Sequence, residues 1–411
     1  MSEPRTPLPE PRWPGVRPAG PSPREWATSV GLFFATLVSA WFVYGWFWGG
    51  GSVLDDPALA WDGALYAGGL MAILLAHESG HYVVARRHGM DQTLPYFIPF
   101  PLAFGTLGAI IRLRALPRSR TALLEMGAAG PLAGFVVAVL VMALGMPGTV
   151  EQATPELVTP WPPPISEPDS GLFIDLLLAL DGALGALIDA VRGLSALPGL
   201  GWIASAMDGA FPPAEPGMQV LMILANPPLM DLLGEVILGQ PPGRYASIHP
   251  LALAGWAGCF LTAMNLLPIG QLDGGHITNA LAPKLARRLS RAGLWVAVAA
   301  GVLWLGWTIW GLLLWKMGAW RSLPVPESEP PSRRARVIAL AALACFGLCF
   351  MPVPFEQDTL RLTDLRLLTP DGREVSKAEV EAWIQDTLAP TGEGGGDENS
   401  DSEGAIEGTR P

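Results

Sequence analysis

The sequence predicts an all-α polytopic membrane protein with about six transmembrane helices. Half of the 411 residues are hydrophobic and only 15% are charged, values that are rare in a soluble protein of this length. The apolar residues lie in long runs, each near or above the roughly 20 residues that cross a bilayer, and nearly all without a charged side chain. The six runs are residues 26–54, 63–85, 126–150, 245–272, 292–315 and 337–355.

A Pro- and Arg-rich arm, residues 1–25, precedes the first apolar run, and we expect it to be disordered. The arm has neither the apolar core nor the small-residue cleavage site of a secretory signal peptide, so the first helix is expected to stay attached. That helix is predicted over residues 26–48. It ends in Trp46, Phe47 and Trp48, which are typical of the aromatic belt at a membrane surface.

The second helix, about residues 64–87, carries the motif H-E-S-G-H at residues 77–81. On a helix, His77 and His81 lie at positions i and i+4, so both imidazoles project from one face. This spacing supplies two nitrogens for a tetrahedral Zn²⁺, and Glu78 is placed to take a proton from a zinc-bound water. The alternative is a pair of helix histidines with satisfied hydrogen bonds. Lipid offers no water to satisfy them, so polar side chains here indicate function.

Residues 88–121 contain several prolines and are not expected to span the membrane. Within them, residues 104–114 end in alternating apolar and basic side chains, which predicts a short strand or hairpin. The third helix is expected over residues 122–146, where several glycines permit close helix packing. Residues 26–146 therefore form a first membrane block.

A long insertion, residues 147–244, follows this block and opens with a Pro-rich linker. It contains two moderately apolar stretches, about 172–194 and 217–238. We interpret the first as an amphipathic helix at the membrane surface. The second is broken by Pro227-Pro228, and either stretch could be re-entrant.

A second membrane block, residues 245–355, is predicted to contain the fourth to sixth helices. They are expected at about residues 248–267, 292–315 and 337–353.

The C-terminal tail, residues 356–411, holds 14 acidic and 5 basic residues and so carries most of the net charge of −11. A capping box at residues 376–379 predicts one short helix, and the composition predicts disorder from about residue 391. The rest of the chain is near neutral, and nothing in it indicates nucleic-acid binding.

The placement of Lys and Arg predicts the orientation. Basic loops follow the second and fourth helices, so we expect these loops and the N-terminus on the cytoplasmic side. Five basic residues do not fit this orientation, because they would lie on the outer side if the segment 292–315 crossed the membrane once. Either that segment is not a single full span or the rule fails there. These residues are Lys316, Arg321, Arg333, Arg334 and Arg336.

A catalytic zinc takes three protein ligands and keeps a fourth position open for water. Asp273 is the preferred third ligand, because it follows a charge-free helix and lies near the cytoplasmic side, as His81 does. It also precedes Gly274-Gly275, which let the backbone turn tightly, so an Asp-Gly turn is the alternative for it. His276 competes as a ligand or as a partner of the ligands. The expected role of Glu125 is packing or an ion pair.

These motifs resemble the site-2 protease family of intramembrane zinc metalloproteases, peptidase family M50. The resemblance covers about residues 64–285 and rests on the H-E-S-G-H motif together with N-L-L-P at 265–268 and L-D-G-G at 272–275. The segments 105–110 and 127–131 are similar to the branch that includes the chloroplast EGY-type proteases. No stretch indicates the PDZ domain that some members carry, and the long insertion departs from the minimal family core.

The resemblance implies an integral multi-pass zinc metalloendopeptidase. One Zn²⁺ per chain would be bound by His77, His81 and Asp273, with Glu78 as general base and acid. The site would face the cytoplasmic side, and we expect the bacterial cell (inner) membrane as the location. The expected partners are transmembrane-helix protein substrates and the lipid bilayer, without nucleic acid, and the sequence does not predict the oligomeric state.

The resemblance also implies a way of holding substrate. Asn265 would help to hold the substrate backbone or the oxyanion. Residues 104–114 would form a short re-entrant β segment whose edge receives the unwound substrate. We expect Gly105 and Gly108 of this segment to be substrate-binding residues.

The polar residues favour a protease over two other functions. A catalytically silent membrane scaffold or chaperone of the same fold would be expected to lack the glutamate or a ligand, whereas all four residues are present. A metal or ion transporter would be expected to carry polar sites along several helices, often in inverted repeats. The polar residues here gather in two segments only, which favours the protease.

Overall fold

A computed structural model describes most of the chain, and contacts divide the chain into two compact units. The first unit consists of residues 1–155 and 221–358, and the second of residues 156–220 and 359–411. The described residues are 20–114, 117, 119–152, 156–158, 218–302, 304–318, 320–321, 329–369 and 371–388.

Among the described residues, helices long and apolar enough to cross a membrane form at three of the six predicted spans. Each begins at a polar residue whose side chain accepts a hydrogen bond from the first turn: Ser22, Asp56 and Ser119. Two of them run on through a short helical extension. They are α1 (Pro23–Val43, with η1 Tyr44–Trp48), α2 (Pro57–Arg87) and α3 (Arg120–Gly145, with η2 Met146–Gly148).

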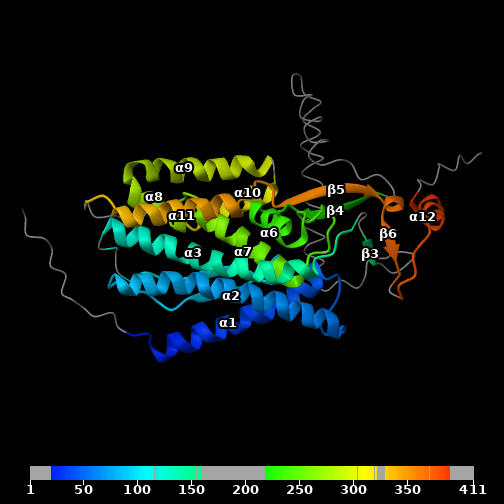
Figure 1. Cartoon of the computed structure of the whole chain (residues 1–411), viewed down its shortest axis with the longest axis horizontal. Helices are drawn as coiled ribbons and strands as arrows, with labels where there is room; N and C mark the ends of the chain where they lie inside the picture. The colour runs from blue at the N-terminus through cyan, green and yellow to red at the C-terminus, as the bar shows by residue number, and fades with distance from the viewer. Residues whose placement is uncertain are drawn as a thin grey trace, which may run out of the picture. The chain divides into compact units, whose positions relative to one another are not determined.

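The fourth helix, α7 (Pro250–Leu266), packs against both α2 and α3, and Figure 1 shows the three side by side. Ile73 of α2 and Met142 of α3 are buried where these helices meet glycines of α7. Small residues allow the close approach, because a Cβ at Gly255 would lie 2.5 Å from the Cβ of Met142. The bundle thus encloses a continuous core around the histidine-bearing helix.

The prediction of a single fifth span over residues 292–315 is wrong. The segment folds into α9 (Pro283–Ala299), the turn η4 (Ala300–Val302) and α10 (Leu305–Lys316), and α10 packs back along α9 (Figure 1). The Thr308 hydroxyl donates to the carbonyl of Val298 at 2.9 Å across this turn. An uninterrupted apolar composition hid the reversal, because it fits one long helix and two short ones equally well.

This helical hairpin explains why basic residues follow the segment 292–315. α10 runs back along α9 as far as Leu314, which packs in one cluster with Leu294, so the chain turns back toward the end of the bundle where α9 begins. The chain then enters α11 (Arg333–Cys349), the helix predicted at 337–353, from that side. Segment 292–315 is thus not a single helix, which agrees with the first of the two alternatives.

The predicted hairpin between α2 and α3 is confirmed. It consists of β1 (Tyr96–Pro99) paired antiparallel with β2 (Thr106–Ile110), with an irregularity between Phe97 and Pro99. Its base is held by the Ser29 hydroxyl, which donates to the carbonyl of Pro95 at 2.6 Å.

Two further hydrogen bonds hold the tip of the hairpin. The Trp48 ring N–H donates to the carbonyl of Ala103 at 2.9 Å, and the Tyr66 hydroxyl donates to that of Phe104 at 3.2 Å. Ser29 and Trp48 stand 19 residues apart along the first helix. That separation corresponds to roughly 28 Å, so the hairpin lies along most of the bundle.

The remaining elements are short. The stretch 217–238 breaks at Pro227-Pro228 as predicted, into the strand β4 (Met218–Leu224) and the helix α6 (Pro228–Leu238). The stretch 172–194, most of the N-terminal arm and the tail beyond residue 388 lie outside the described residues. β4 pairs with β5 (Phe355–Arg361), and β3 (Glu156–Val158) pairs with β6 (Arg366–Leu368). The remaining short helices are α8 (Asp273–Leu281), η5 (Leu362–Asp364), α12 (Lys377–Trp383) and η6 (Ile384–Leu388).

Candidate metal centre

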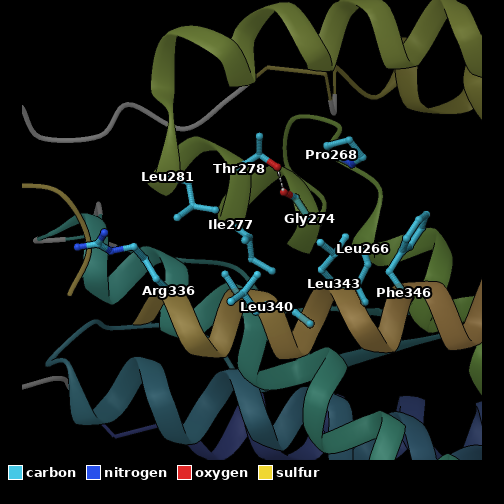
Figure 2. Close-up of a pocket in the computed structure, with 12 residues that line it drawn as sticks. Leu266, Pro268, Gly274, Ile277, Thr278, Leu281, Arg336, Leu340, Leu343 and Phe346 are labelled. Carbon is cyan, nitrogen blue, oxygen red and sulfur yellow. Dashed lines mark hydrogen bonds between the residues drawn. The ribbon is translucent and has the colours of Figure 1, made fainter. Parts of the chain in front are cut away.

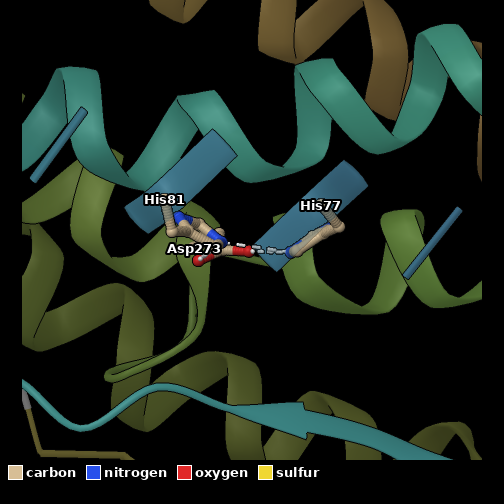
Figure 3. Close-up of side chains that lie close together, drawn as sticks. All are labelled: His77, His81 and Asp273. Carbon is tan, nitrogen blue, oxygen red and sulfur yellow. Dashed lines mark hydrogen bonds and ion pairs between the residues drawn. The ribbon is translucent and has the colours of Figure 1, made fainter. Parts of the chain in front are cut away.

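Two helices bring His77, His81 and Asp273 together (Figure 3). The Nε2 atoms of His77 and His81 lie 3.1 Å apart. The carboxylate of Asp273 lies 3.1 Å from the first of these nitrogens and 3.3 Å from the second. Residues almost 200 positions apart in the chain thus converge on one point between α2 and α8.

These separations fit a tetrahedral zinc ion. Ligand atoms about 2.0–2.1 Å from Zn²⁺ at tetrahedral angles stand about 3.3 Å from one another. The three measured distances, 3.1, 3.1 and 3.3 Å, are close to that value. Two imidazoles and one carboxylate are also a donor set that zinc accepts, with a fourth position left for water or substrate.

The hydrogen bond on the other ring nitrogen of His81 fixes its tautomer. Nδ1 of His81 donates to the carbonyl of Met126 at 2.8 Å. The proton therefore resides on Nδ1, which leaves the Nε2 lone pair pointing toward His77 and Asp273. Metal-binding histidines are ordinarily held in this way.

Glycines of α3 make room for the imidazole rings. A Cβ at Gly130 would lie 2.0 Å from Nε2 of His81, and one at Gly134 would lie 3.1 Å from Cβ of His77. Gly80 of α2 is equally constrained, since a Cβ there would lie 2.4 Å from the carbonyl oxygen of Ala129. The α3 glycines, predicted only as packing residues, therefore line the candidate metal site.

The loop before α8 places Asp273 as the first residue of that helix. Gly270 turns the chain with φ of +43°, and its N–H donates to the buried Ser290 hydroxyl at 2.9 Å. Gly274 and Gly275 cannot be replaced without a clash, because their Cβ atoms would lie 1.9 and 2.4 Å from backbone oxygens of this loop. The turn chemistry that the sequence suggested as an alternative thus serves to position the carboxylate.

Glu78 lies beside the histidines on α2 and is 6% exposed. Within the described residues, its carboxylate forms no hydrogen bond that would occupy it. His77 and His81 are 5% and 8% exposed, so the whole group is removed from bulk water. An unoccupied carboxylate in such surroundings has strong interactions with any charge that develops beside it.

Three other polar residues singled out in the sequence lie outside the set of three candidate ligands. Glu125 accepts a hydrogen bond from Nε2 of His88 at 2.9 Å. His276 is 9% exposed and lies outside the set of three, and its Nδ1 has no hydrogen-bond partner among the described residues. Asn265 is half-buried near the end of α7, and no hydrogen bond to its side chain forms in the described part of the chain.

The two glycines of the hairpin differ from each other. Gly105 turns the hairpin with φ of +81° and packs on α1, since a Cβ there would lie 2.2 Å from Cα of Ala40. Gly108 has φ of +89° and faces open space. Its neighbour Leu107 is 53% exposed. Gly105 is therefore a structural residue of the turn, and only the edge around Gly108 is open.

The fold and the centre define a polytopic membrane protein with a candidate metal-binding set enclosed by its helices. The chain belongs to peptidase family M50, whose model matches residues 65–306, more than half of its length.

Several similar proteins are plant relatives named for the chloroplast. The chain is 28% identical over 324 residues to "Probable zinc metalloprotease EGY2, chloroplastic" of Oryza sativa subsp. indica, which covers 77% of this chain and 47% of the relative. It is 28% identical over 257 residues to the corresponding EGY1 protein of Arabidopsis thaliana, covering 61% and 36%. The chain thus spans less than half the length of these relatives. No solved structure matches it.

Proposed function

We propose that this chain is an intramembrane zinc metalloendopeptidase that hydrolyses peptide bonds within or near transmembrane segments of membrane-protein substrates. The observation that carries this proposal is the convergence of His77, His81 and Asp273 at zinc-like spacing beside the buried Glu78. The family and the names of the relatives, which specify a zinc metalloprotease, support it.

In this proposal His77, His81 and Asp273 hold one zinc ion. Bound there, zinc would supply Lewis-acid chemistry by acidifying a water and polarising a carbonyl. The tautomer of His81, fixed by Met126, keeps its Nε2 available for the metal. The α3 glycines leave the rings no room to turn away, which preorganises the set.

Glu78 is proposed as the general base and acid. It stands next to a ligand on the same helix, and its carboxylate is free to accept a proton from the attacking water. The same group would then pass that proton to the leaving amine, so that no charge accumulates on the departing nitrogen. The low exposure of the site limits access by other water.

The open edge of β2 is proposed as the surface that holds substrate. A peptide bond in a helix is shielded by its own hydrogen bonds, so the substrate must unwind before it is attacked. In the described residues β2 pairs only with β1, so its other edge is available to an extended strand. Leu107 and Ile110, 53% and 47% exposed, would contact substrate side chains, and Asn265 is proposed to hold the substrate backbone or the oxyanion.

The proposed topology keeps the hairpin re-entrant. α1, α2, α3, α7 and α11 would cross the bilayer, and the α9–α10 pair would enter and return in place of a sixth span. α7 and α11 have 17 residues each, about 25 Å, which fits a crossing of a locally thinned bilayer. The tip of the β1–β2 hairpin bonds to Trp48 at the far end of the first helix, which supports entry from the side of the basic loops.

The compartment and the division of the chain are also proposals. The basic loops favour a site that opens to the cytoplasmic side of a cell membrane, or to the equivalent side of a plastid membrane if the chain shares the location in its relatives' names. An N-terminal arm, two membrane blocks, the insertion 147–244 and the acidic tail 356–411 are kept as the working division.

Reconstitution tests the proposal directly. The purified chain is placed in lipid vesicles with a library of tagged transmembrane peptides, and cleavage is followed by mass spectrometry. Treatment with 1,10-phenanthroline is expected to abolish cleavage, and added Zn²⁺ is expected to restore it. Cleavage that persists after zinc has been removed to below about 0.1 per chain would overturn the proposal, and so would a zinc-loaded chain that cleaves no member of the library. A silent scaffold would give the latter result.

A further inference from the structure

A groove separates α8 from α11 (Figure 2). Its volume is about 560 Å³. One wall is formed by Gly274, Ile277 and Leu281 of α8, and the other by Leu340 and Phe346 of α11. The lining is apolar from one end almost to the other.

The groove opens toward the surroundings of the bundle. Leu281, Leu340 and Leu343 line it and are 39%, 65% and 63% exposed. Side chains of this kind on a membrane-length bundle face hydrocarbon and not water. The molecule that fills the groove must therefore be supplied by the bilayer or inserted in it.

One end of the groove is strongly basic. Arg336 lines this end, and its Nε donates to the carbonyl of Pro331 at 3.3 Å. Arg333 and Arg334 are exposed in the same first turn of α11. No carboxylate pairs with these three arginines in the part of the chain that the structure describes, so positive charge is left available at the level where lipid headgroups lie.

We propose that this groove binds an anionic phospholipid of the bilayer. The headgroup phosphate is held by Arg336, and one acyl chain lies along Ile277, Leu340 and Phe346. Arg336 and Phe346 are ten residues apart on α11, about 15 Å, so the groove accommodates most of an acyl chain. A charged head joined to a long apolar tail matches the distribution of polarity along the groove.

The lining argues against an unwound peptide as the occupant. An extended backbone brings an N–H and a C=O at every residue, and each unpaired group costs several kcal/mol in hydrocarbon. The one hydroxyl in the lining, Thr278, already donates to the carbonyl of Gly274 at 2.6 Å. Between Arg336 and Phe346 the lining has no free donor for such a backbone, whereas an acyl chain needs none.

Native mass spectrometry of the purified full chain tests the proposal without reference to catalysis. The chain is titrated with dioleoyl phosphatidylglycerol, with dioleoyl phosphatidylcholine and with glycerol 3-phosphate. We expect tighter binding of phosphatidylglycerol than of phosphatidylcholine and no competition by glycerol phosphate. Arg336→Gln is expected to weaken phosphatidylglycerol binding about fivefold. Leu343→Trp, which fills the groove from its exposed rim, is expected to weaken binding of the same lipid without changing the charge.

Arg287→Gln is the matched control, because Arg287 is an exposed arginine of α9 that does not line the groove. Equal loss of binding in Arg287→Gln and Arg336→Gln would overturn the proposal, since it would indicate general surface attraction. Competition by glycerol phosphate would also overturn it, in favour of a plain anion site. A third overturning result is retention of lipid by both groove variants while a tagged transmembrane peptide with an acidic flank is lost, since the occupant would then be a peptide.

Discussion

The candidate metal centre and the β1–β2 hairpin lie in one bundle but are built in opposite ways. At the centre, His77 and His81 are almost completely buried, and a single added methyl group on α3 would strike a ring. Along β2, the side chains of Leu107 and Ile110 are about half exposed, and one strand edge has no partner in the described residues.

This difference separates two tasks of the proposed peptidase. Chemistry requires ligands held within fractions of an ångström, which dense packing provides. Capture of varied transmembrane segments requires backbone hydrogen bonds that any sequence can form, which an open strand edge provides. Substitutions at the centre should therefore affect rate and metal content, and substitutions on the edge should affect substrate affinity alone.

The largest effect is expected from Glu78→Gln. The amide preserves shape but cannot accept the proton of the attacking water, so peptide cleavage should fall by about 10²–10⁴-fold. Zinc content, measured by plasma mass spectrometry, should stay within about twofold of wild type, because Glu78 is not among the ligands. Glu125→Gln, which alters a carboxylate paired with His88, is the control. Wild-type turnover in Glu78→Gln would exclude this glutamate from the reaction.

Asp273→Ala should come next, with loss of metal preceding loss of activity. Removal of a group that only orients a ligand already costs about 10–100-fold in affinity, so removal of a ligand should cost more than about 100-fold. Competition with a zinc-binding dye measures this. Asp62→Ala removes a carboxylate of α2 outside the set and should leave zinc affinity unchanged. If zinc affinity also survives in Asp273→Ala, the third ligand is another residue, and His276 is the first to test.

Gly130→Ala tests the packing of the centre without touching a ligand. Its methyl group would meet Nε2 of His81 at 2.0 Å, so the ring must shift, and zinc affinity should fall about 10–100-fold. Gly68→Ala is the matched control, because a Cβ at Gly68 of α2 meets nothing within 4 Å. Equal zinc affinity in the two variants would show that the centre tolerates movement and would weaken the contrast with the hairpin.

Leu107→Ala on the β2 edge should have the smallest effect. Losing part of the apolar contact with substrate should raise KM about fivefold and leave kcat and zinc content unchanged. Leu312→Ala, an exposed leucine of α10 away from the hairpin, should change neither constant. A fall in kcat for Leu107→Ala would mean that the hairpin also positions the scissile bond.

Much of this arrangement could be predicted, because a lipid environment restricts the positions at which polar residues occur. The spacing of His77 and His81 and the position of Asp273 after a charge-free helix were visible in the sequence, and the structure brings these three together. The helices 26–48, 64–87 and 122–146 were equally visible, because lipid demands long apolar runs.

Other features depend on contacts that a linear pattern does not contain. The role of Gly130 depends on the rotation of two helices about their axes, which the glycines of α3 do not reveal. The α9–α10 reversal depends on a turn at Gly301, where a Cβ would lie 1.7 Å from the Thr308 hydroxyl. The basic residues from Lys316 to Arg336 were the only sign of that turn, and they left open whether the segment turns back or the charge rule fails.

The α9–α10 hairpin also decides where the chain finishes. Because the pair returns to its starting side, α11 carries the chain to the opposite side, and β5 begins there beside β4, with the Ala225 N–H donating to the carbonyl of Pro354. In the proposed topology, the reversal at Gly301 therefore places the beginning of β5 across the membrane from the arginines that open α11.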